Sequence, residues 1–164
     1  DYECMSEVYW TPQENGDAQD YCLIGTNSDM GLHLMTGTSK PGTGTVLKSY
    51  PNLACTFGWN FFEVSGRKLM AFVDVVDKTR PTVKLIEGDY TTLAGLQAAL
   101  DAYSEENTLF NAPLQDELDP SVLGFTEGIF IGDCCVRTIG DDIYMAAGVN
   151  CVGMSMFKLN KNFF

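Results

Sequence analysis

The chain is poor in basic residues: 10 Lys and Arg stand against 22 Asp and Glu in 164 residues, a formal net charge of −12. A phosphate backbone is attracted to a basic surface, so this balance argues against DNA or RNA as a partner. Histidine is almost missing, and His33 is the single one. Any histidine-dependent catalytic or metal site would therefore include it. We instead expect a short strand that projects it outward between two leucines.

Long apolar runs, glycosylation sequons and cysteine pairs with metal-binding spacing are missing too. The apolar stretches, of which Leu69–Val73 and Tyr144–Val149 are the longest, fall far short of the roughly 20 residues that a membrane-spanning helix needs. The length fits one domain over residues 1–164, with 45% hydrophobic residues to build a core. No spacing of the C-x2-C kind is present, which argues against a zinc site, and we expect no metal or cofactor.

Cysteine, by contrast, is abundant for this length. An even number of cysteines at this density is typical of proteins from oxidising compartments, where disulfides persist. We therefore expect a secreted, extracellular protein with three disulfides, whose connectivity the sequence leaves open. A start at Asp1 rather than Met fits a processed secreted chain. The six cysteines are Cys4, Cys22, Cys55, Cys134, Cys135 and Cys151.

Extended patterns dominate the chain. Cys55–Val64 and Arg67–Val76 flank the turn residues Ser65 and Gly66 and predict a hairpin, and Thr82–Glu87 predicts a third strand beside it. Four more extended pieces follow a loop at residues 104–121, in which we expect a short helical turn at 114–118. They are Val122–Ile131, Cys134–Ile139, Ile143–Val149 and Cys151–Leu159.

One segment has a helical period, and the first third of the chain has little pattern. Leucines at 93, 96 and 100, followed by Tyr103, recur every three or four residues and predict an amphipathic helix near 91–103, capped by Thr91 or Thr92. Residues 1–54 are rich in glycine and proline and are expected to be mostly loop. The fold class is therefore mainly β, either all-β or α+β. We expect a disulfide-linked antiparallel β-sandwich or partly closed barrel of seven to nine strands.

Carboxylates are the only candidates for catalysis. Glu63, Asp74 and the Asp141–Asp142 pair supply the acids that a glycoside hydrolase needs, but acids are so plentiful here that the pattern is weak. Asp74 interrupts an apolar strand, so it either faces outward, which we favour, or is buried with a partner. Lys84 is expected on the face opposite Val83.

Charge is distributed unevenly. Residues 93–142 carry ten acidic and one basic residue. A basic cluster lies on the predicted meander and consists of Arg67, Lys68, Lys78, Arg80 and Lys84. The last strand carries lysines and no acid and ends in two phenylalanines, and an apolar strand edge invites pairing with another chain.

These features favour a non-enzymatic interaction protein. Our leading hypothesis is a self-associating subunit of a structural or surface assembly, a homo-oligomer or a binder of another protein, that uses its C-terminal strand edge and charge complementarity. The candidate interface residues are Met154, Met156, Phe157, Lys158, Lys161, Phe163, Phe164, Arg67, Lys68 and Arg80. One alternative is a secreted β-barrel whose aromatic and methionine side chains line a cavity for a small apolar ligand. A second alternative is a carboxylate-based secreted hydrolase.

Overall fold

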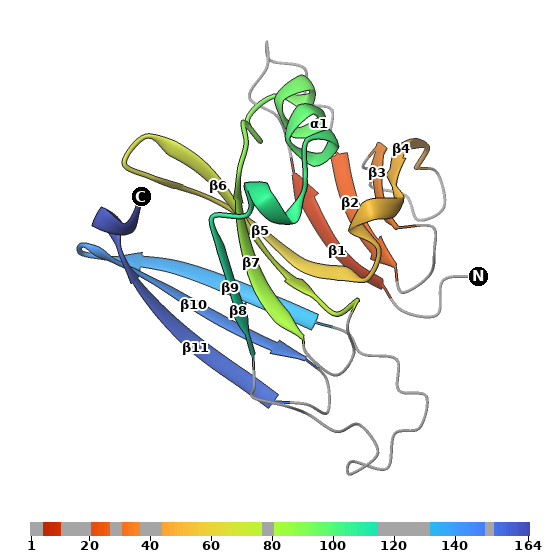
Figure 1. Ribbon diagram of the computed structural model, residues 1–164. Coiled ribbons are helices and arrows are strands. Elements are labelled where there is room, and N and C mark those ends of the chain that lie inside the picture. The colour runs from red at the N-terminus through yellow and green to blue at the C-terminus, as the bar shows by residue number, and fades with distance from the viewer. Residues whose placement is uncertain are drawn as a thin grey trace, which may run out of the picture.

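The computed structural model of the chain describes residues 5–10, 21–26, 31–36, 44–76, 81–114, 132–149 and 153–164 (Figure 1). These residues form three antiparallel sheets and one α-helix, which confirms the mainly β class. They contain eleven strands, more than the seven to nine expected, and the three sheets do not close into a barrel. The strand predicted at 122–131 and the helical turn predicted at 114–118 lie outside the described residues, apart from Leu114.

The N-terminal sheet occupies the region that we expected to be mostly loop. Its strands follow one another in the order β1-β2-β3-β4, as an antiparallel meander. Strands of only five or six residues explain why periodicity was hard to recognise in this region. The strands are β1 (Met5–Trp10), β2 (Tyr21–Thr26), β3 (Leu32–Thr36) and β4 (Val46–Tyr50).

The central sheet contains the predicted hairpin and the third meander strand. Ser65 and Gly66 both have positive φ, 53° and 78°, which is the geometry of a tight hairpin turn. The fourth strand was missed because it has only four residues and ends in a proline. The strands are β5 (Thr56–Val64), β6 (Arg67–Asp74), β7 (Thr82–Glu87) and β8 (Phe110–Pro113), paired in that order.

The C-terminal sheet has the order β11-β10-β9 and confirms three predicted strands: β9 (Gly132–Ile139), β10 (Asp142–Val149) and β11 (Gly153–Asn160). Buried and exposed residues alternate along it, so that Cys134 is buried and Cys135 is exposed. Such alternation means that one face packs against the protein and the other faces outward.

The predicted helix, α1 (Leu93–Asp101), begins after Thr92, whose side chain accepts a hydrogen bond of 3.0 Å from the Gly95 amide. Leu96 and Leu100 are its buried positions. Three short 3-10 helices complete the described elements: η1 (Pro51–Leu53), η2 (Glu105–Asn107) and η3 (Lys161–Phe163).

Two hydrophobic cores lie on the two faces of the central sheet. One core joins it to the C-terminal sheet through Phe57, Val73 and Met145, among others. The other joins it to the N-terminal sheet and α1 through residues such as Phe72 and Leu96. Figure 1 shows the central sheet between these two sets of elements. Because both faces are covered, β6 and β7 consist almost entirely of buried residues.

One glycine allows the central and C-terminal sheets to approach closely. Gly58 in β5 has φ +63°, and a Cβ there would lie 2.5 Å from the backbone nitrogen of Cys134 in β9. The register of β5 against β6 also shifts between Phe57 and Asn60, as in a β-bulge. Residue 58 is therefore a position at which only glycine satisfies both the backbone conformation and the contact.

Candidate interaction surface

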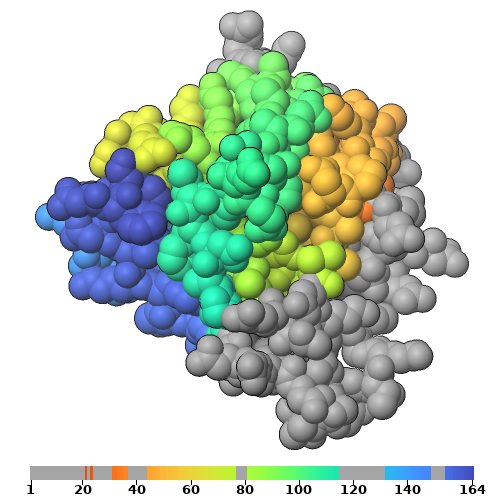
Figure 2. Space-filling view, in the orientation of Figure 1, coloured from red at the N-terminus to blue at the C-terminus, as the bar shows by residue number. Residues whose placement is uncertain are grey.

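β11 is the edge strand of the C-terminal sheet. Among the described strands it pairs with β10 alone, so one row of its backbone N–H and C=O groups has no ladder partner there. Its eight residues contain no proline and no described bulge, two devices by which natural edge strands discourage pairing. β11 lies at the boundary of the sheet in Figure 1, and the C-terminal residues, in blue, form part of the surface seen in Figure 2.

The side chains of β11 separate into two faces. Met154 and Met156 are 75% and 69% exposed, and Lys158 lies on the same outward face. The inward positions include Phe157, which is half-buried and meets the ring of Phe110 edge to face at 5.6 Å between centroids. Inward packing therefore holds the strand in place and leaves two large apolar side chains outside.

The residues after β11 are attached to the central sheet. The Asn160 side chain caps η3, and the Lys161 amide donates to the Asp141 carbonyl at 2.8 Å. Phe163 is 54% exposed, whereas Phe164 is half-buried and its carbonyl oxygen accepts a 2.7 Å hydrogen bond from Arg67 Nη1. These contacts fix the C-terminal segment beside the β5–β6 hairpin.

The other edges of these two sheets differ from β11. β8 is short and contains Pro113. β5 and β9 lie against each other, because the Asn60 Nδ2 in β5 donates a hydrogen bond to the Cys134 carbonyl in β9. β11 is therefore the edge of these two sheets that the described residues cover least, and Lys158 is the one charged side chain on it.

The described members of the basic cluster, Arg67, Lys68 and Lys84, are in ion pairs within the chain. Arg67 pairs with Glu87 at 2.6 Å and Lys68 pairs with Asp89 at 2.7 Å. These hydrogen bonds lower the pKa of both carboxyl groups. Lys78 and Arg80 lie outside the described residues.

The C-terminal lysines are paired in the same way. Lys158 pairs with Asp142 at 2.8 Å and Lys161 pairs with Asp141 at 3.2 Å. The hydrogen bond to Asp142 raises the pKa of Lys158. The charges on this surface are therefore balanced locally rather than left for a partner.

The position of Asp74 differs from the one that we favoured. It is 7% exposed, so the favoured outward position is wrong and the buried alternative holds. Its partner is Lys84, which is itself 4% exposed and lies 2.7 Å from the Asp74 carboxylate. Both residues face the second core, because a sheet covered on two faces leaves no outward side.

Two further residues, Tyr103 and Glu105, contact the lysine of this buried pair. The Lys84 ammonium also contacts the Glu105 carboxylate and lies 3.1 Å from the Tyr103 hydroxyl. Burial lowers the pKa of Lys84, but its hydrogen bonds to Asp74 and Glu105 outweigh that effect and raise the pKa above its ordinary value. The cluster attaches η2 to the central sheet, and sequence reasoning missed it because its members are distant in the chain.

His33 is also buried rather than projected outward, at 3% exposed, since β3 lies in the second core. Its Nδ1 is 2.7 Å from the Ser49 hydroxyl, and burial lowers its pKa. No described group of three or more His, Cys, Asp or Glu side chains could hold a metal ion. No helix in the described part of the chain is long and apolar enough to cross a membrane.

The described residues show none of the three expected disulfides, which stay a prediction for the chain as a whole. Cys134 and Cys135 carry free thiols, and no disulfide joins described residues. Burial raises the pKa of the Cys134 thiol to about 12. Cys55 is half-buried against the first core. The side chains of Cys4, Cys22 and Cys151 lie outside the described residues.

The side chains proposed to line a ligand cavity are packed instead. Phe57, Phe72, Met70 and Met145 are fully buried, and they belong to the two cores described above. Trp59 stacks on Phe72 with 4.2 Å between ring centroids. This packing favours filled interiors over a barrel cavity.

Comparison of the chain with family models, with curated proteins and with solved structures finds no match.

Proposed function

We propose that this protein is a non-enzymatic extracellular interaction protein that associates with further copies of itself through the edge of β11. The observation that carries the proposal is the combination of an eight-residue edge without proline or described bulge and two exposed methionines, Met154 and Met156. Pairing at this edge would satisfy the backbone groups of β11 and bury both apolar side chains. A homo-oligomer is the partner that needs no further assumption.

Charge complementarity is no longer part of the mechanism. The described basic residues of the 67–84 cluster and both C-terminal lysines already have acidic partners within the chain. Exposed pairs of this kind contribute little free energy, and exchanging them for equivalent pairs between chains would gain little. The strand edge, rather than long-range charge attraction, is expected to determine how copies associate.

Sedimentation velocity over a range of protein concentrations tests the proposal. The variant Met154→Lys/Met156→Lys adds charge at the edge without touching the core, so the wild type should form oligomers and the variant should remain monomeric. The matched control is Ile139→Lys, which adds charge on the opposite edge strand at a side chain that is 64% exposed. A monomeric wild type, or equal dissociation of both variants, contradicts the proposal.

The extracellular location is part of the same proposal and rests on the six cysteines. Any disulfides would have to involve residues other than the free thiols Cys134 and Cys135. Intact mass before and after reduction and alkylation measures how many bridges the protein from its natural source contains. A mass equal to that of six thiols contradicts an oxidising compartment.

A further inference from the structure

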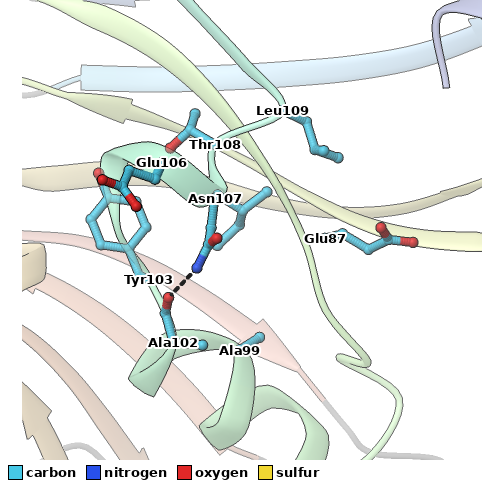
Figure 3. A pocket seen from close by; sticks show the side chains of 9 residues that line it. Glu87, Ala99, Ala102, Tyr103, Glu106, Asn107, Thr108 and Leu109 are labelled. Carbon is cyan, nitrogen blue, oxygen red and sulfur yellow. Dashed lines mark hydrogen bonds between the residues drawn. The ribbon is translucent and has the colours of Figure 1, made fainter.

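A pocket lies between the end of α1, η2 and β7. Its volume is about 400 Å³, which is within the range of small-molecule sites. In Figure 3, Ala99 of α1 and Ala102, which follows the helix, lie below it, Thr108 and Leu109 lie above it, and Tyr103 and Glu106 lie to one side. The pocket is distant from the β11 edge in sequence, and the self-association proposed above does not use it.

The walls of this pocket provide both apolar surface and hydrogen-bonding groups. Ile86, Ala99 and Leu109 supply an apolar lining, and the ring of Tyr103 adds an aromatic surface. The Asn107 side chain donates to the Ala102 carbonyl at 2.9 Å, and this bond, the dashed line in Figure 3, holds η2 against the helix end. This hydrogen bond fixes the position of Asn107 in the lining.

The charge in the pocket is negative. Of its two carboxylates, Glu87 is held by Arg67, whereas Glu106 is exposed and has no ion pair among the described residues. No lysine or arginine lines the pocket. The end of α1 adds to this polarity, because its last turn carries no basic residue and the carboxyl end of a helix is its negative pole.

We propose that this pocket binds a small primary amine, an alkylammonium group whose charge is held by Glu106 and whose chain lies on the apolar lining. The Tyr103 ring favours the same ligand class, because aromatic faces attract cations. An anionic ligand would meet Glu106 and the helix end without any compensating cation. A neutral apolar ligand would leave the Glu106 carboxylate without a charged partner.

NMR titration of isotope-labelled protein with n-butylammonium tests this inference. The amides of Ala99, Ala102 and Asn107 should shift and saturate at millimolar concentrations, whereas butyrate should leave them unchanged and butanol should bind about tenfold more weakly. No saturation by about 50 mM butylammonium overturns the proposal. Equal binding of butanol overturns the role assigned to charge.

Two variants assign the effect to the pocket. Glu106→Gln should weaken butylammonium binding about tenfold, while Glu63→Gln, which removes an equally exposed carboxylate outside the pocket, should not change it. Ala102→Leu should obstruct the pocket and abolish binding with Glu106 intact. Equal weakening by the two glutamate variants would mean that only net charge matters. The same titration with a lysine-containing tripeptide then shows whether the pocket also accepts the ammonium group of a protein side chain or takes only a free amine.

Discussion

The central sheet and the C-terminal sheet are both antiparallel, yet they are built for different surroundings. In the central sheet β6 has no exposed residue and even a lysine–aspartate pair is buried, whereas in β9 buried and exposed residues alternate along the strand. One sheet is covered on both faces and stabilises the molecule. The other presents a face and an edge with large apolar side chains, the features of an interaction surface.

The largest expected effect is on the free energy of unfolding, and it distinguishes a buried ion pair of the central sheet from an exposed ion pair of the C-terminal sheet. Lys84→Met leaves Asp74 buried without a charged partner and should lower the free energy of unfolding by about 3–5 kcal/mol. Lys158→Met breaks an exposed pair of similar length and should leave stability almost unchanged. Urea unfolding of both variants measures the difference. Equal losses would contradict the distinction between the sheets.

The contact between the two sheets can be tested with a pair of glycines. Gly58 and Gly140 have similar positive φ, 63° and 60°, but only at residue 58 would a Cβ meet another strand. Gly58→Ala should therefore cost about 2–4 kcal/mol, and Gly140→Ala should cost about 1 kcal/mol for backbone strain alone. Thermal unfolding compares them. Similar losses would show that the close approach of β5 and β9 contributes little.

The two adjacent cysteines report on the two faces of β9. Alkylation with iodoacetamide at pH 8 should modify Cys135 at least about tenfold faster than Cys134, because the Cys134 thiol is buried and has a raised pKa. The variants Cys134→Ser and Cys135→Ser allow each thiol to be followed by mass spectrometry. In urea the two rates should converge. Equal rates in the folded protein would place both side chains on an accessible surface.

The smallest expected effect concerns His33, which is buried in β3. Because burial lowers its pKa, the folded state favours the neutral ring, and this contribution is present above pH 6.5 and lost as the pH falls below it. Wild-type stability should therefore decline between about pH 7 and 5.5, and His33→Gln should remove most of that slope. The paired carboxylates Glu87 and Asp89 titrate at lower pH. Identical slopes for both proteins would contradict a buried neutral histidine.

Local sequence patterns predicted the elements whose signals are local. The β5–β6 hairpin follows from its turn residues, and α1 follows from leucines at helical spacing with Thr92 before them. Of the N-terminal sheet only the short strand around His33 was expected, because each strand has five or six residues and carries little periodic signal. The last extended segment of the chain was expected to offer a strand edge, because a terminal strand has fewer neighbours to pair with. β11 is an edge strand of its sheet.

Other features depend on tertiary contacts that a single sequence does not reveal. Asp74 was expected to face outward because buried acids are rare, and only the approach of Lys84 from the next strand makes its burial tolerable. The pocket beside Glu106 is formed by α1, η2 and β7 together, so no one segment carries its signature. The ion pair between Arg67 and Glu87 likewise joins residues that are distant in the chain and are brought together by the pairing of β6 with β7.

Hydrogen–deuterium exchange, measured residue by residue at low and high protein concentration, tests the central claim most directly. If β11 pairs with another copy, its outward amide hydrogens should exchange more slowly as concentration rises, while those of β9 should stay unchanged, and Met154→Lys/Met156→Lys should abolish the effect. Exchange in β11 that is independent of concentration would contradict self-association through this edge.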